Sequence, residues 1–236
     1  MANRLIGELR PQQLITTFGP GSITDGKNDS IVVLDCDYWP SEGKTIKDPR
    51  LSKYMGVFDF KTPGQKHWGV PAISFPDYHV CSNKKCNSLF KLSDSINLDK
   101  YTKQGPKCPK CGGTFDAYPS RFIVYCEDGH MDDFPWMDWV HDNEGHSCKG
   151  DNLTITSLGF SSSLADIRVT CNECKKSKTM AGVLNKKAFE AYSCNGKHPH
   201  RPKEKFKSCK KHKQWIPSLR GASNVYFSVI KSAISI

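Results

Sequence analysis

Residues 81–86 read Cys81-Ser82-Asn83-Lys84-Lys85-Cys86, and residues 108–113 read Cys108-Pro109-Lys110-Cys111-Gly112-Gly113. Two thiolate pairs on tight turns can close a tetrahedron around zinc, and the glycines let backbone N–H groups approach the sulfurs. Four free surface cysteines are the alternative, which we disfavour because paired reduced cysteines have few other uses. Four thiolates leave no open coordination position, so the sequence predicts a structural zinc site formed by Cys81, Cys86, Cys108 and Cys111.

A second cysteine pair, Cys171-x2-Cys174, stands at the end of an expected strand. We expect Cys194 and Cys209 to complete a second zinc site with this pair, and Cys148 competes for the fourth place. Two zinc ions are therefore expected as cofactors, and the eight cysteines named so far are the predicted metal ligands.

A third, mixed site remains open. Cys126-x3-His130 could combine with His141, His146 and Cys148, but this spacing is permissive. The alternative is that Cys126 packs at a strand end and His141 is a satisfied helix residue. We favour this alternative because single Cys and His residues are commonly just packed.

The cellular compartment follows from the N-terminal sequence and from the cysteines. No apolar signal region follows Met1, and no apolar run approaches the length of a membrane span. We therefore expect a cytoplasmic protein with no membrane partner. Its thiols would be reduced, which favours metal over disulfides.

The charge of the chain is polarised. The formal net charge of +10 falls to roughly +6 when eight thiolates bind two zinc ions. Residues 127–144 carry seven acidic residues and no Lys or Arg, whereas Lys197 to Lys213 carries eight Lys or Arg and one acid. This basic run could contact DNA phosphates, with Phe206 and Trp215 nearby for stacking, or it could be a solvated loop.

The expected fold is α+β, with mostly short strands, a zinc-ribbon insert and a second zinc-bound module. We divide the chain into residues 1–76, an N-terminal part of the core; 77–120, the zinc-ribbon module; and 121–236, the rest of the core. The β-branched or alternating patterns predict strands at 31–35, 56–60, 121–126, 153–160, 167–171 and an exposed C-terminal strand from 223 onward. Helical spacing predicts helices at 5–14, 133–141 and 181–192, with Asp133 capping the second.

Two motifs raise the question of enzymatic activity. Gly21-x4-Gly26-Lys27 is close to a phosphate-binding loop, but Asn28 replaces the Ser or Thr, and the motif precedes a strand when it should follow one. His130, Asp132 and Asp133 could form a nuclease-like metal site. We favour a turn followed by an aromatic docking helix, because no second carboxylate cluster completes a two-metal site.

Several further motifs occur in a characteristic order. They are Arg10-Pro11-Gln12-Gln13, Phe18-Gly19-Pro20-Gly21, Asp37-Tyr38-Trp39, Phe75-Pro76-Asp77, Pro119-Ser120-Arg121-Phe122, the segment 126–136 with Trp139-Val140-His141, Cys171-x2-Cys174, Cys194-Asn195-Gly196 and the segment 221–227. Together they resemble the N-terminal part of the DrmB family, a component of the bacterial DISARM anti-phage defence system. The resemblance spans nearly all of the chain.

This resemblance implies a helicase-associated protein. DrmB family members partner DrmA, a large helicase-like ATPase, in a complex that engages foreign DNA. Members are usually much longer than this chain, and the family has no well-defined catalytic residues to carry over. We therefore expect a non-catalytic zinc-binding scaffold subunit, partnering a DrmA-like ATPase. The alternatives are a stand-alone DNA-binding zinc protein and, less favoured, a metal-dependent nuclease.

Overall fold

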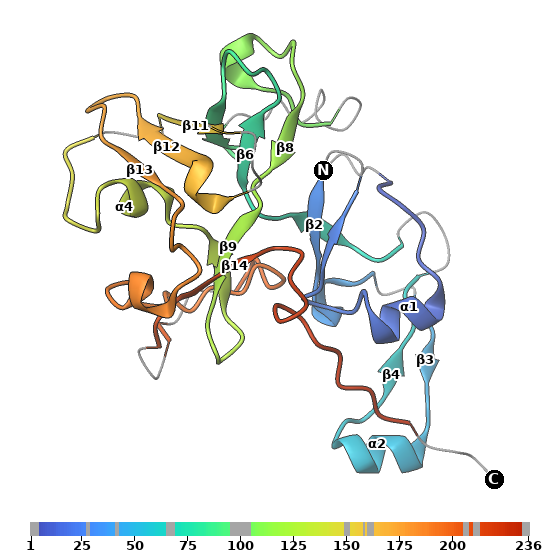
Figure 1. Ribbon diagram of the computed structural model, residues 1–236. Helices are drawn as coiled ribbons and strands as arrows, with labels where there is room; N and C mark the ends of the chain where they lie inside the picture. Colours follow the sequence, from blue (N-terminus) through green and yellow to red (C-terminus); the bar gives the residue numbers. More distant parts are fainter. Residues whose placement is uncertain are drawn as a thin grey trace.

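The computed structural model describes residues 5–26, 29–40, 43–64, 69–94, 105–148, 152–157, 159, 163–204, 208–209 and 213–232. Most of the regular elements are short antiparallel strands, and the α-helices are few and short (Figure 1). Within these ranges, no helix has the length and apolar character that crossing a membrane requires. The predicted class of mostly short strands is confirmed at this level.

The described residues from 5 to 76 form an N-terminal lobe around a three-stranded sheet of order β1-β2-β5 (Figure 1). Its central strand consists of four buried residues, as its β-branched sequence predicts. A short pair, β3 with β4, and two helices complete the lobe. The elements are α1 (Pro11–Thr16), β1 (Ile23–Asp25), β2 (Ser30–Val33), η1 (Cys36–Tyr38), β3 (Thr45–Ile46), α2 (Pro49–Met55), β4 (Phe60–Lys61) and β5 (Ala72–Ser74).

The second lobe contains a six-stranded sheet of order β13-β12-β11-β7-β6-β8. Its strands are β6 (Tyr78–Cys81), β7 (Ser88–Lys91), β8 (Ala117–Pro119), β11 (Leu153–Ser157), β12 (Ile167–Cys171) and β13 (Ser177–Thr179). Leu89 of β7 pairs with Leu153 of β11, and both are fully buried. The strands of residues 77–120 therefore continue into one sheet with the strands of residues 153–179.

A third sheet, of order β10-β9-β14, lies between the other two (Figure 1). Its strands are β9 (Phe122–Tyr125), β10 (Met131–Asp133) and β14 (Ile216–Leu219). The remaining elements are α4 (Trp136–Val140) and the 3-10 turns η2 (Pro109–Cys111), η3 (Leu164–Asp166) and η4 (Lys186–Phe189). The predicted strands at 121–126 and 167–171 are confirmed within a residue.

The tryptophans of α4 form the centre of the core of the second lobe. Trp136 and Trp139 are 1% and 3% exposed, and the ring of Phe134 lies 4.5 Å from the ring of Trp136 between centroids. Trp139 stacks on Phe189 at 5.8 Å. The prediction that this helix presents tryptophans to a partner is wrong, because both tryptophan side chains are buried in the core of the protein.

Other predicted elements differ from the structure for local reasons. The N-terminal helix begins at Pro11, which serves as its first residue because proline needs no intrahelical N–H bond there. Gly56 has a φ of 67° and ends α2, so the predicted strand at 56–60 shrinks to β4. The pattern at 181–192 yields turns and η4, and Asp133 lies in β10 instead of capping α4.

The C-terminal segment also differs from its prediction. Up to residue 232, the described residues after β14 form no strand. The segment crosses back to the N-terminal lobe, where Val225 packs against a core cluster and Ser228 donates a hydrogen bond to the Thr16 carbonyl. Described residues near both termini are therefore parts of one lobe.

Polar contacts join the two lobes. The Arg220 guanidinium donates to both carboxylate oxygens of Asp25 at 2.9 and 3.2 Å, and to the carbonyls of Pro119 and Ser120 at 2.8 Å each. Arg201 Nε donates to Asp35 Oδ2 at 2.7 Å. One arginine from each of two distant loops thus fixes the N-terminal lobe against the rest.

Candidate metal centres

Three groups of four Cys or His side chains each bring their ligand atoms within 4.8 Å of one another. The first tetrad is Cys81, Cys86, Cys108 and Cys111; the second is Cys126, His130, Cys194 and Cys209; the third is His141, Cys148, Cys171 and Cys174. Each could hold a metal ion. All cysteines in these tetrads are free thiols.

The first tetrad is built from two turns that approach each other beyond the ends of β6 and β8. Cys81 Sγ lies 3.8 Å from Cys111 Sγ, and Cys86 Sγ lies 3.8 Å from Cys108 Sγ. The Asn83 backbone N–H donates to Cys81 Sγ at 3.4 Å. Such N–H donors stabilise a thiolate, as in metal-binding turns. Gly112 and Gly113 adopt positive φ angles beside Cys111, which explains why glycine follows this cysteine.

The thiols of the first tetrad differ in acidity. Burial raises the pKa of Cys81 and of Cys108. Burial also acts against the Cys86 thiolate, but the Ser88 backbone hydrogen bond and the neighbouring thiols lower the pKa of Cys86 overall. A cation at the centre would favour the thiolate form of all four.

The second tetrad gathers ligands from three places in the sequence. Cys126 and His130 flank the turn between β9 and β10, with Sγ and Nδ1 separated by 3.2 Å. The Gly196 N–H donates to Cys194 Sγ at 3.3 Å. Cys209 stands shortly before β14, and its thiol donates to Asp128 Oδ2 at 3.6 Å. The pairing of β9 with both β10 and β14 brings these segments together.

The third tetrad lies at the end of α4. His141 Nε2 is 3.3 Å from Cys174 Sγ and 3.7 Å from Cys148 Sγ, and Cys148 lies 3.7 Å from Cys171. His141 Nδ1 is 2.7 Å from the Met137 carbonyl. A proton on Nδ1 would therefore be donated to this carbonyl, which leaves Nε2 with a free lone pair aimed at the sulfurs. A second hydrogen bond of this kind is typical of metal-binding histidines.

The electrostatics of the third tetrad favour one thiolate in particular. A backbone hydrogen bond from Lys176, followed by a hydrogen bond from His141, lowers the pKa of Cys174 to about 6. Burial raises the pKa of Cys148 to about 12. Cys174 is exposed, whereas Cys171 is buried.

The distances can be compared with the geometry of zinc. A Zn–S bond is about 2.3 Å, so the edge of a ZnS4 tetrahedron is about 3.8 Å, and a mixed S–N edge is about 3.6 Å. The four Sγ–Sγ or Sγ–Nε2 separations of 3.7 to 3.8 Å fit these edges, and the two shortest S–N separations are 3.2 and 3.3 Å. A disulfide would need about 2.05 Å. The sulfur and imidazole donors therefore fit zinc.

The structure divides the second predicted ligand set. Cys171 and Cys174 lie in the third tetrad, whereas Cys194 and Cys209 lie in the second. The expectation of two ions is corrected to three candidate centres. Cys148, the competing fourth ligand of the predicted second site, does join Cys171 and Cys174. Cys126, His130 and His141 were expected only in the less favoured mixed site. His146 is absent from the tetrads and stacks on His141 at 4.2 Å between ring centroids.

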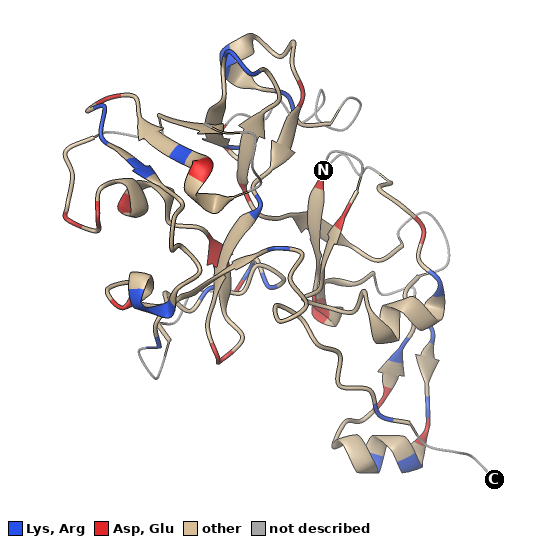
Figure 2. Ribbon diagram, in the orientation of Figure 1, with Lys and Arg blue, Asp and Glu red and all other residues tan. Residues whose placement is uncertain are grey.

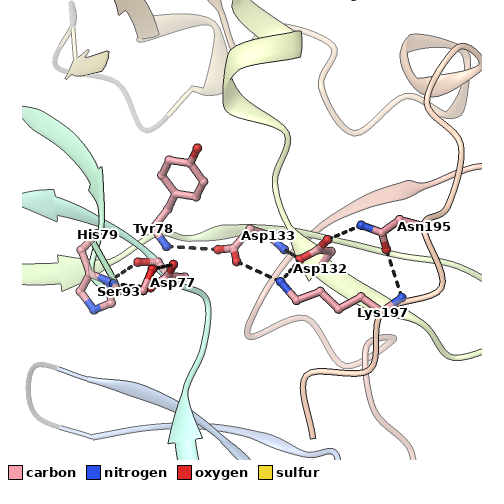
Figure 3. Close-up of polar contacts among 8 residues, drawn as sticks. All are labelled: Asp77, Tyr78, His79, Ser93, Asp132, Asp133, Asn195 and Lys197. Carbon is pink, nitrogen blue, oxygen red and sulfur yellow. Dashed lines mark hydrogen bonds and ion pairs between the residues drawn. The ribbon is translucent and has the colours of Figure 1, made fainter. Parts of the chain in front are cut away.

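The carboxylates beside the second tetrad form a polar network rather than an open site (Figure 3). Asp132 accepts from Lys197 Nζ at 2.5 Å and from Asn195 Nδ2 at 2.6 Å. Asp133 accepts the Tyr78 backbone N–H at 3.1 Å, and its other oxygen lies 4.0 Å from Lys197 Nζ. The network links β10 to the start of β6 and to the loop that carries Cys194.

The same network explains an unusual acidity. Burial raises the pKa of Asp133 to about 7, although Lys197 and the Tyr78 N–H act in the opposite direction. Desolvation also acts against charged Lys197, but the attraction of Asp132 and Asp133 raises the pKa of Lys197 overall. Lys197 therefore stays charged and compensates the acidic pair.

The basic run Lys197 to Lys213 is partly neutralised by acids. Lys197 pairs with Asp132, Arg201 with Asp35, and Lys213 with Glu127. Phe206 and the remaining basic residues other than Lys203 lie outside the described residues. Lys203 Nζ stands 5.9 Å from the centre of the Tyr38 ring. These basic side chains hold the fold together, so the described part of the run is not a free cationic strip.

Sequence comparisons relate the chain to known proteins. A family model described as "Domain of unknown function (DUF8724)" matches residues 10–227. The DISARM protein DrmB from Bacillus paralicheniformis is 47% identical over 214 residues. This match covers 90% of the chain and 37% of the relative. The chain thus spans a little over a third of the length of the curated relative it matches.

Proposed function

This chain belongs to the DUF8724 family and is homologous to DISARM protein DrmB, and from this membership we propose that it is a zinc-stapled, non-catalytic scaffold subunit of an anti-phage defence complex. Its partner would be a DrmA-like, helicase-like ATPase that acts on foreign DNA. It would work in the cytoplasm, where the thiols stay reduced and available to metal.

The observation that carries the scaffold proposal is the coordination number of the tetrads. Each supplies four Cys or His ligands, which is the complete shell of structural zinc. A catalytic zinc site keeps one position for water or substrate. Three complete sets of four ligands support a structural role, in which zinc stabilises small modules of the fold. In this α+β fold, the first tetrad would stabilise a zinc-ribbon insert, and the other two would stabilise further zinc-bound modules.

The nuclease alternative loses its candidate residues to other roles. His130 belongs to the second tetrad, Asp132 is paired with Lys197, and Asp133 accepts from the Tyr78 N–H. We therefore expect no DNA cleavage by the purified chain with magnesium or manganese. Cleavage that His130→Ala abolishes, while zinc content falls by no more than one ion, would revive the nuclease hypothesis.

The partner proposal is tested by co-purification. The tagged chain is expressed with the helicase-like protein encoded beside it, and the mass of the eluted complex is measured. A stoichiometric complex is the expected result. Elution of the chain alone, folded and with zinc bound, would contradict the subunit role.

Direct DNA contact through Lys197 to Lys213 remains the second candidate function, favoured by the density of basic residues there. It predicts binding without any partner, with an affinity that falls steeply as salt rises. Lys203→Glu should weaken that binding, because this exposed lysine makes no ion pair among the described residues. Affinity that is insensitive to salt would exclude this candidate.

A further inference from the structure

The N-terminal lobe carries a surface of large apolar side chains that no described residue covers. Among the described residues, fifteen large apolar side chains are exposed, and twelve of them lie in residues 5–58 or 227–230. Phe58 is 99% exposed, Val229 80% and Phe227 74%. We call the apolar face the surface formed by Ile15, Tyr54, Phe58, Phe227, Val229 and Ile230.

The C-terminal part of the apolar face is attached to the helices of the N-terminal lobe. Ser228, between Phe227 and Val229, donates to the Thr16 carbonyl of α1, and Lys231 Nζ lies 5.6 Å from the centre of the Tyr54 ring on α2. The C-terminal segment therefore runs beside α1 and α2 (Figure 1). These contacts bring exposed apolar side chains of α1, of α2 and of the C-terminal segment into one neighbourhood, and such groups on a monomer often mark a binding site.

Basic side chains border the apolar face. Lys47, Arg50, Lys53 and Lys231 are exposed. Figure 2 shows Lys and Arg residues along α2. Of the nearby acids, Asp48 accepts the Leu51 N–H at the start of α2, and Asp59 is exposed beside Phe58, so basic residues outnumber acidic ones at this border. An apolar centre with a cationic rim fits an apolar surface with an acidic rim.

We propose that the apolar face is the docking site for the part of a DrmB polypeptide that lies outside the match with this chain. The relative devotes 63% of its length to that part, since the match covers 37% of it. In the relative, both parts belong to one polypeptide, so the matched domain has a large intramolecular neighbour. The three tetrads lie in residues 81–209, outside the N-terminal lobe, so this contact would leave them accessible. The proposal rests on the apolar face and on the family membership, and it requires neither bound zinc nor an ATPase partner.

The first test is reconstitution. The 236-residue chain is co-expressed with a separate polypeptide comprising the unmatched part of the Bacillus paralicheniformis DrmB, and the complex is captured through a tag on the chain. The expected result is a one-to-one complex. The double variant Tyr54→Ser and Phe58→Ser should reduce the captured partner at least tenfold, and 1 M NaCl should reduce it further. Leu184→Ser, which alters an apolar side chain 46% exposed on the other lobe, should change nothing.

The second test needs no separated fragment. Amide hydrogen exchange is compared between this chain and full-length DrmB of Bacillus paralicheniformis at aligned positions. The segments aligned with α2 and Val57–Phe58 should exchange at least tenfold more slowly in the full-length relative. The turn aligned with Leu184 should exchange equally in both proteins.

Two results would overturn the proposal. One is equal exchange of the α2 region in both proteins. The other is a dimer of the lone chain that Tyr54→Ser with Phe58→Ser dissociates, because the occupant would then be a second copy. Loss of the ATPase complex in a protein that still passes both tests would count against the proposed function only.

Discussion

Replacing Asp133 with asparagine should change how the stability of the protein depends on pH. Asp133 is only 13% exposed and its pKa is raised to about 7, whereas an unfolded aspartate titrates near its ordinary pKa of 3.8. The folded state therefore binds the proton more tightly than the unfolded state. The stability that Asp133 contributes is complete below the unfolded pKa and is lost as pH rises toward the folded pKa.

The magnitude follows from the two pKa values. One pKa unit corresponds to about 1.4 kcal/mol, so the whole shift is worth about 4 kcal/mol. Between pH 5.5 and pH 8, where zinc ligands are less disturbed by acid, the part that is lost is about 2 kcal/mol. The introduced asparagine cannot ionise, and its carbonyl oxygen can still accept the Tyr78 N–H. The free energy of unfolding of Asp133→Asn, relative to wild type, should therefore rise by about 2 kcal/mol over this range.

The assay is urea unfolding of both proteins in the same buffers with excess zinc, followed by tryptophan fluorescence. Effects of pH on the metal centres are shared and cancel in the difference. Asp138→Asn is the matched control, since Asp138 is an exposed carboxylate on the neighbouring helix α4. The reasoning is refuted if the difference between Asp133→Asn and wild type stays within about 0.5 kcal/mol from pH 5.5 to pH 8, or if Asp138→Asn shows the same slope.

Two further predictions concern the metal centres and the contact between lobes. Elemental analysis should find three zinc ions per chain, and a content of two or fewer would contradict the assignment. A chelator should remove the ion of the third tetrad first, because Cys174 is exposed. Arg220→Ala should lower the free energy of unfolding by about 1–3 kcal/mol, because Asp25 and two backbone carbonyls would lose their hydrogen-bond donor. Arg121→Ala, at an exposed neighbouring position, should cost nearly nothing, and equal losses would refute the role of Arg220.

The first tetrad could be predicted from sequence because each of its pairs is set by a local turn. Cys81 with Cys86 and Cys108 with Cys111 are close in sequence, and β6, β7 and β8 are neighbours in one sheet. Only one step had to be inferred, namely that the turn with Cys81 and Cys86 lies next to the turn with Cys108 and Cys111. The ligands, their number and the structural character of the site all follow from that spacing.

The other two tetrads could not be assigned because their partners are chosen by sheet topology. Cys171-x2-Cys174 is joined by His141 at the end of a helix, and nothing local connects these positions. Cys194 and Cys209 meet the β9–β10 turn only because β14 pairs with β9. One signal was available in the sequence: every cysteine except Cys36 enters a tetrad once two histidines are added, which requires three centres instead of two.

The burial of Trp136 and Trp139 could not be predicted from the sequence for a related reason. A short helix with two tryptophans three residues apart has the same pattern whether its aromatic face meets a partner or the core. The aromatic face of this helix meets the core because Phe189, which lies in η4, stacks on Trp139. The exposed apolar surface that a partner could use lies instead on the N-terminal lobe, where Phe58 and Phe227 find no such neighbour among the described residues.

The second tetrad also has a mechanical consequence for the whole chain. The segment that starts at Cys194 continues through Lys197, whose carbonyl accepts the Met131 N–H at 2.9 Å, to His200, whose carbonyl accepts the Asp35 N–H at 3.0 Å. The next residue, Arg201, holds the Asp35 carboxylate. A metal ion that fixes Cys194 against Cys126 and His130 would therefore also fix the segment that fastens the N-terminal lobe. Because the proposed docking surface lies on that lobe, zinc in the second tetrad would set the orientation in which the lobe is presented to its partner.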